Sequence, residues 1–246
     1  MAQTARDTIT EHLRGEILRG VYPAGGRLPA ERELAQRLGA NRSSVREALR
    51  KLEQSGLVEI VHGGGATVLP IERASIDVIR HLLAVTGAPD RKLLEQVLEV
   101  HELLLVGGTR LAIEHGDPLQ LDRARELLGQ LADSSTDVET FLDTIEEVLG
   151  LIGEASGNLV LKMARRAVNP LFDERFREIR RRFRPPDERI RNMVAEIDQA
   201  IALRDADAAE RALRSFLRAG RDQALEALSS YSSVGQTTAD STGDPR

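Results

Sequence analysis

The segment from Gly39 to Leu57 constrains the fold of this 246-residue chain more than any other. Asn41 is a favourable N-cap for a helix, and Gly56 suits the left-handed backbone that commonly follows a helix end. Between them, apolar residues recur at helical spacing and three arginines stand four apart on a different face. The apolar residues are Val45, Ala48, Leu49 and Leu52, and the arginines are Arg42, Arg46 and Arg50. The segment is therefore predicted to form a helix with one core face and one cationic face.

A cationic helix of this kind fits the major groove of DNA, where an arginine fork can bond a guanine edge or a phosphate. The same arginines would also suit an ordinary solvated surface, and this segment alone leaves both interpretations open. Its flanks favour DNA. A short apolar helix is predicted over 30–38, a tight turn follows at Gly39 and Ala40, and an earlier amphipathic helix is predicted over 8–18. Together these segments have the order of a helix-turn-helix.

The pattern after Gly56 changes to that of strands. Residues 57–61 and 66–69 are rich in β-branched side chains, and glycines occupy 63–65 between them. This pattern predicts a β-hairpin wing. A phosphate-binding loop is disfavoured because no Gly-Lys-Ser sequence opens a helix after these glycines. The bare backbone at His62 and Gly63 could approach the sugar–phosphate backbone, although His62 would equally suit a solvated hairpin.

Composition limits the classes of function. The formal net charge of −5 means that any DNA contact must come from a local basic patch. The absence of cysteine excludes disulfides, thiolate zinc sites and thiol catalysis. No signal peptide or membrane-spanning run is recognised, so a soluble cytoplasmic protein is expected. Acidic pairs have no base, nucleophile or cofactor loop beside them, and we therefore expect neither an enzyme nor a cofactor.

The chain after the hairpin is predicted to be helical almost throughout. Helices are predicted over 76–85, 93–113, 119–131, 138–155, 159–168, 172–183, 187–203 and 206–228. The predicted fold is mainly α, with an N-terminal winged helix-turn-helix at 1–70, a linker at 71–75 and an antiparallel all-α bundle at 76–228. The remaining residues, 229–246, are rich in Ser, Thr, Gly and Asp and are predicted to be a disordered tail.

The first seventy residues resemble the winged helix-turn-helix of the GntR family of bacterial transcription regulators. The matching segments are Ile17–Gly20, Gly26–Ala35, Leu38–Gly39, Asn41–Leu49 and Leu52–Val58. The resemblance implies DNA contacts from Arg32, Arg42, Ser43, Ser44 and Arg46, with His62 and Gly63 at the wing tip. Asn41 replaces the Ser or Thr more usual in the family, but it caps a helix equally well.

The later helices resemble the FCD ligand-binding domain of the FadR subfamily, an antiparallel bundle around a pocket. The resemblance rests on Glu154–Asn158 and Ala200–Ala209. Many members bind a divalent metal through an acidic residue and three histidines, and the metal in turn holds a small carboxylate. The corresponding positions here are Ile145, Leu149, Val194 and Phe216, whose side chains offer no lone pair to a metal. A metal site of that type is therefore not expected.

A hydrocarbon-lined pocket favours an apolar effector, because unpaired carboxylates are costly to bury. We expect a fatty acid or an acyl-CoA. His101 and Arg110 lie in the segment that lines the family's pocket and could orient a head group, or they could be a core histidine and a surface arginine. The sequence thus predicts a ligand-responsive homodimer, usually a repressor in such families, that reads a pseudo-palindromic DNA operator. The alternative is a metal-dependent FCD regulator that senses a small carboxylate through other ligands.

Overall fold

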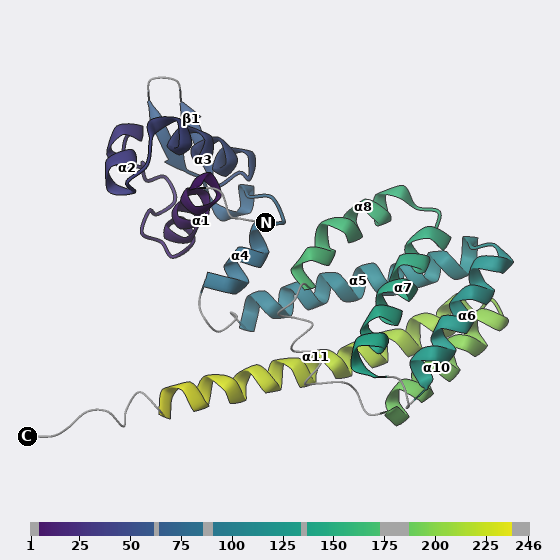
Figure 1. Cartoon of the computed structure of the whole chain (residues 1–246). Helices are drawn as coiled ribbons and strands as arrows, with labels where there is room; N and C mark the ends of the chain where they lie inside the picture. The colour runs from purple at the N-terminus through teal and green to yellow at the C-terminus, as the bar shows by residue number, and fades with distance from the viewer. Residues whose placement is uncertain (1–4, 62–63, 86–90, 134–136, 173–186, 238–246) are drawn as a thin grey trace, which may run out of the picture. The chain divides into compact units, whose positions relative to one another are not determined.

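The computed structural model describes residues 5–61, 64–85, 91–133, 137–172 and 187–237 (Figure 1). The chain divides into two compact units, Met1–Pro89 and Asp90–Arg246. Helices dominate both units, and the described strands form one two-stranded antiparallel sheet. The predicted class is therefore confirmed: a mainly helical protein with an N-terminal winged helix-turn-helix and a C-terminal helical bundle. None of the described helices combines the length and apolar character that a membrane span requires.

The first unit has the order of elements predicted for a winged helix-turn-helix. These are α1 (Ala5–Leu18), α2 (Glu31–Arg37), α3 (Arg42–Gln54), β1 (Val58–Val61), β2 (Gly65–Val68), the short 3-10 helix η1 (Ile71–Arg73) and α4 (Val78–Val85). The hairpin register sets Val58 opposite Val68. The loop before α2 extends the sheet, since the Leu28 N–H donates to the Ala66 carbonyl at 2.8 Å. The wing is thus tied, through β2, to the loop between α1 and α2.

The core of the first unit is almost entirely aliphatic. Leu13 of α1, Leu34 of α2 and Leu52 of α3 are each fully buried, and Val45 joins them from the first turn of α3. Burying such a side chain contributes about 1.5–3 kcal/mol relative to leaving it exposed. Packing against α1 and α2 therefore fixes the rotation of α3 about its own axis, so that its opposite face points outward.

The first unit continues beyond the linker that the sequence predicts at 71–75. The Ser75 N–H donates to the Ser55 carbonyl at 3.0 Å, which ties this segment to the end of α3. Val78, in the first turn of α4, is 1% exposed and belongs to the same hydrophobic core. The polar composition of the segment indicated a linker, but backbone hydrogen bonds and one apolar anchor hold it in place. The division between the units instead falls at Pro89, within residues outside the described ranges.

A histidine contributes to the packing of α4 on α1. His81 Nδ1 lies 3.4 Å from a carboxylate oxygen of Glu11, and Arg14 Nη1 lies 3.1 Å from Nε2. Burial lowers the pKa of His81 below its ordinary value, with the charge of Arg14 adding to the effect. The imidazole is therefore neutral at neutral pH and can accept a hydrogen bond from the guanidinium.

The second unit contains six α-helices and one 3-10 helix among its described residues. They are α5 (Arg91–His115), α6 (Pro118–Ala132), α7 (Val138–Ala155), α8 (Leu159–Val168), η2 (Asn169–Phe172), α10 (Asp187–Ala202) and α11 (Ala206–Thr237). Side-chain caps fix three of the helix starts: Asp117 caps α6, Asp137 caps α7 and Asn158 caps α8. Of the helix predicted over 172–183, residues 173–183 lie outside the described part of the chain.

Five of these helices close a ring (Figure 1). Helix α5 lies along α11, α11 packs on α10, α10 on α6, α6 on α7, and α7 returns to α5. Helix α8 packs across α5 and α7, where Gly108 allows a close approach: a Cβ there would lie 3.2 Å from Leu161 and 3.3 Å from Ile152. Two successive glycines, Gly107 and Gly108, do not interrupt α5, which continues through both.

The last helix runs further than the sequence suggests. Helix α11 continues to Thr237, whereas the polar residues from 229 onward indicated a disordered tail. The boundary at 228 is thus corrected for residues 229–237. Continuation has a simple basis, because the chain carries no proline from 221 to 237 and only one glycine, Gly235, near the end of that span. Residues 238–246 lie outside the described ranges.

The end of α3 offers a test of the first unit. Gly56 has φ +71°, and a Cβ there would fall on the backbone carbonyl oxygen of Arg73, whereas Gly39, with φ +58°, has open space. Gly39→Ala should cost about 1–2 kcal/mol from the left-handed backbone alone. Gly56→Ala should cost about 1–3 kcal/mol more, because it also forces η1 away. Calorimetric unfolding of the full chain measures both variants. Equal destabilisation would contradict the docking of residues 71–75 on the first unit.

Candidate DNA-binding surface and ligand cavity

The position of α3 is fixed at its first residue and along its inner face. The Asn41 carboxamide oxygen accepts a hydrogen bond from the Ser44 N–H at 2.8 Å, as predicted for an N-cap. The inner stripe is buried: Val45, Ala48 and Leu52 have no exposed surface and Leu49 has 4%. Both features leave the arginine face of α3 outward.

The outward face carries Arg42, Arg46 and Arg50, all of them exposed. Arg46 is held by Glu31 at the start of α2, through Nε to Oε1 at 2.9 Å and Nη2 to Oε2 at 2.8 Å. The hydrogen bond from Arg46 lowers the pKa of the Glu31 carboxyl, and the charges of Arg42 and Arg50 lower it further. The carboxylate therefore remains ionised and holds the guanidinium plane between the two helices of the motif.

The other residues predicted to touch DNA divide into three groups. Arg32 and Ser43 are exposed beside the arginine face. Ser44 is 8% exposed, because it lies next to Val45 on the inner side of the helix. The sequence prediction of a side-chain contact at Ser44 is therefore not supported by the structure. His62 and Gly63, at the predicted wing tip, lie outside the described residues.

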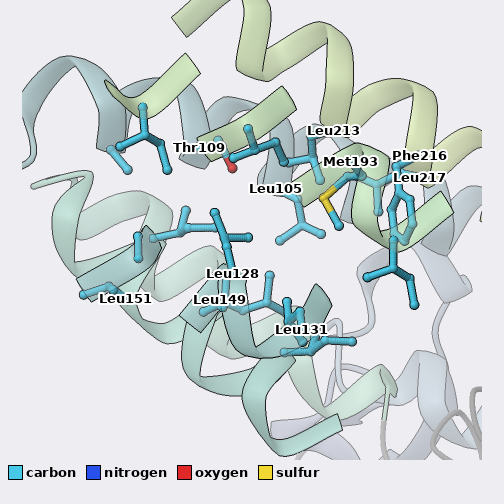
Figure 2. Close-up of a pocket in the computed structure, with 18 of the residues that line it drawn as sticks. Leu105, Thr109, Leu128, Leu131, Leu149, Leu151, Met193, Leu213, Phe216 and Leu217 are labelled. Atoms are coloured by element: carbon cyan, nitrogen blue, oxygen red, sulfur yellow. The ribbon is translucent and has the colours of Figure 1, made fainter. Parts of the chain in front are cut away.

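The helix ring of the second unit encloses a cavity of about 270 Å³ (Figure 2). Every helix of the ring contributes apolar side chains, and those of opposite walls point towards a common space in Figure 2. The labelled examples include Leu105 from α5, Leu128 from α6, Leu149 from α7, Met193 from α10 and Phe216 from α11. Such a wall can bind hydrocarbon through dispersion and exclusion of water.

Few polar side chains reach this wall. Thr109, at 5% exposure, presents a buried hydroxyl that has no hydrogen-bond partner. Arg221 of α11 also lines the cavity, and its Nε is likewise buried without a partner. His101 and Gln120 complete the set, but the Gln120 carboxamide oxygen already accepts a hydrogen bond from the Asp117 N–H at 3.2 Å. The cavity is thus apolar, with a small number of polar points.

Four of the six residues predicted for the pocket line this cavity. They are His101, Ile145, Leu149 and Phe216. Val194 is buried at 7% but belongs to the surrounding core, while Met193 and Ile197 of the same helix face the cavity. Val194 was predicted to line the pocket, but the neighbouring residue Met193 does so instead.

Arg110 lies elsewhere, contrary to its predicted place in the pocket. Its Nη1 is 2.6 Å from a carboxylate oxygen of Asp207 and 3.2 Å from one of Glu210, and its Nε is 3.0 Å from Glu114. The helical period explains the difference. His101, Leu105 and Thr109 stand four apart on the cavity face, and Arg110 is rotated by about 100° from Thr109. Its alternative interpretation as a surface arginine agrees with the structure.

Thr109, Gln120 and Arg221 are the polar cavity residues that the sequence prediction missed. A helical-period count from His101 would have reached Thr109, whereas Arg221 is five residues beyond Phe216 and shares its helix face with Leu217, which also lines the cavity. No group of three His, Asp or Glu side chains within the described ranges is arranged to hold a metal ion.

Comparison with known families gives one match for each unit. Residues 5–68 match the model of the bacterial regulatory proteins of the gntR family. Residues 96–219, about half of the chain, match the FCD domain. The first match covers α1 to β2, and the second includes all the residues that line the cavity except Ala224, Arg221 and Gly220.

Individual proteins show the same likeness. An uncharacterized HTH-type transcriptional regulator of Mycobacterium tuberculosis, Rv0494, is 38% identical over 118 residues, which are 47% of this chain and about half, 47%, of that protein. A fatty acid metabolism regulator protein of Yersinia pestis is 25% identical over 172 residues, 70% of each protein. The solved structure of Lar, which controls expression of the Listeria monocytogenes agr system, has 18% identity and a TM-score of 0.54, over 92% of this chain and 99% of that one. The last comparison bears on the fold alone.

Proposed function

Because the chain belongs to the GntR family of bacterial regulatory proteins and carries an FCD domain, we propose that it is a transcription regulator that reads operator DNA with α3. The family is one of transcription regulators and not of enzymes. The observation that carries the proposal is the outward arginine face of α3, fixed by the Asn41 cap and the buried stripe behind it. A protein that binds chromosomal DNA in a bacterium acts in the cytoplasm.

The residues proposed to contact DNA are Arg32, Arg42, Ser43 and Arg46, with His62 and Gly63 as the wing-tip contribution. Glu31 orients the Arg46 guanidinium before DNA arrives, which reduces the conformational entropy lost on binding. A guanine edge or a phosphate would then replace the carboxylate or share the guanidinium with it. Arg42 and Arg50 add positive charge on the same side, although the formal net charge of the whole chain is −5.

Two copies of the chain would read a pseudo-palindromic operator, one half-site each. An apolar strip on the second unit supports a homodimer. Leu159, Val160 and Met163 of α8 are 68%, 75% and 63% exposed, although the buried side of the same helix carries Arg165 at 7%. A helix whose apolar side chains face outward is better explained by burial against a second copy than by solvent.

The second unit is proposed to bind an apolar effector, such as a fatty acid or an acyl-CoA, in its cavity. The hydrocarbon wall supports this choice, and so does the likeness to a fatty acid metabolism regulator protein. Binding of the effector would cause the protein to release its operator, as in a repressor that is relieved by its ligand. The effector can do so only if it binds two arrangements of the protein with different affinities.

Arginine substitutions test the DNA-binding surface. Selection from a random duplex library with the full chain would supply a bound duplex, and fluorescence anisotropy would measure its affinity. Arg42→Ala and Arg46→Ala should each weaken binding by about 1–3 kcal/mol, because each removes a charge-assisted contact. Arg125→Ala, which removes an exposed second-unit arginine paired with Asp198, is the matched control and should leave affinity unchanged. Unchanged affinity in the α3 variants, with dimers intact by sedimentation, would refute the proposed surface.

A cavity-filling substitution tests the effector site. The uncharged fluorescent probe N-phenyl-1-naphthylamine should bind the full chain saturably, since an apolar wall excludes water around it. Leu149→Trp fills the cavity and should weaken probe binding at least about tenfold, because the indole takes the space of the ligand. Leu119→Trp places the same side chain at a position that is 82% exposed and should bind the probe like the wild type. Equal binding by both variants would mean that the probe, and the proposed effector, lie elsewhere.

A further inference from the structure

Two buried polar atoms without partners mark the cavity wall. The Thr109 hydroxyl oxygen and the Arg221 Nε are both inaccessible to solvent and unbonded, and both residues line the cavity. Buried polar groups are nearly always hydrogen-bonded, so an unpaired donor beside an empty space indicates a missing partner. The missing partner of a guanidinium is an anion with two adjacent oxygens.

We propose that the effector is a free monocarboxylic acid with a hydrocarbon tail, and that Arg221 binds its carboxylate at one end of the cavity. This inference rests on the proposed function, because it names the head group of the same ligand. The Arg221 side chain is 24% exposed, and its nearest carboxylate oxygens are those of Asp222 at 3.7 Å and Glu102 at 4.0 Å. Both distances exceed a hydrogen bond, so the guanidinium keeps donors available for a ligand.

Glu102 explains why Arg221 remains available. Glu102 is 8% exposed, and its Oε1 lies 3.3 Å from both Arg214 Nη1 and Arg218 Nε. Two arginines of α11 therefore already saturate one oxygen of this carboxylate, and Arg221 approaches the other oxygen only at 4.0 Å. Arg214 is shared with Glu210 at 2.7 Å, and Asp222, whose side chain is 73% exposed, lies 3.7 Å from Arg221 Nε. Neither Glu102 nor Asp222 is within hydrogen-bond distance of Arg221, so a ligand carboxylate has donors of this guanidinium to bond.

The size of the cavity favours the free acid over its CoA thioester. A volume of about 270 Å³ is close to the lower limit of ligand pockets and suits a hydrocarbon chain with a compact head; the nucleotide of a CoA thioester would have to lie outside the cavity. Thr109 lies seven residues, or about 10 Å along the axis of α5, beyond Glu102, the residue whose carboxylate lies 4.0 Å from Arg221, so a similar length of cavity separates Thr109 from the Arg221 end. An extended chain advances about 1.2 Å per bond, so a tail of about eight bonds spans that length. Decanoic acid is therefore a suitable probe.

Matched ligands and matched arginines test the assignment. Calorimetric titration of the full chain compares decanoic acid with decan-1-ol, which has the same tail and no charge. In Arg221→Gln the affinity for the acid should fall about tenfold to a hundredfold, the usual effect of losing a hydrogen bond to a charged group, while the affinity for the alcohol stays the same. Arg218→Gln removes a neighbour on the same Glu102 carboxylate that does not line the cavity, and it should change acid affinity by less than about twofold.

The outcomes separate this inference from the proposed function. Equal affinity of the wild type for acid and alcohol, or an equal loss in the Arg218 and Arg221 variants, would overturn the role of Arg221 and leave the hydrocarbon effector standing. A loss in Thr109→Val without a loss in Arg221→Gln would assign the head group to the opposite end and also overturn it. Failure of the wild type to bind either probe would overturn the proposed effector class itself.

Discussion

The hydrocarbon wall shared by the five helices of the ring is the feature on which the second unit depends. Each helix contributes one apolar stripe, and α5 contributes the face that contains Leu105, Thr109 and Ala112. The same burial that holds the ring together leaves a space of about 270 Å³ that side chains do not fill. An unfilled apolar space costs packing energy, and a hydrocarbon ligand recovers it. Fold stability and ligand binding therefore draw on the same contacts.

In the first unit, helix α3 contributes to the core and also presents positive charge at the surface. Val45 and Leu52 lie on its buried face, whereas Arg42 and Arg46 lie on its exposed face. The Glu31 carboxylate restrains Arg46 without burying it, because the ion pair lies at the surface in high dielectric. Such a pair adds little to the free energy of unfolding, but it orients the guanidinium group of Arg46.

Local rules were sufficient for part of this structure. Caps, helical periodicity and the glycine-tipped hairpin predicted α1 to β2, and the apolar positions Ile145, Leu149 and Phe216 indicated a hydrocarbon pocket. The direction in which a side chain points from its helix was harder to predict, because a shift of one position along the sequence turns that direction by about 100°. Arg110 and Val194 were misplaced for that reason. The packing of residues 71–85 within the first unit was also not predicted. It depends on backbone hydrogen bonds and on the burial of Val78, and neither is indicated by the polar composition of residues 71–75.

The central claim is that ligand in the second unit alters DNA reading by the first. The most direct measurement is the affinity of the full chain for its selected duplex, with and without saturating decanoic acid, in the wild type and in Leu149→Trp. The account predicts that the acid lowers wild-type affinity about fivefold or more, within the usual range of allosteric coupling, and leaves the filled variant unchanged. Equal DNA affinity of the wild type with and without bound acid would contradict it.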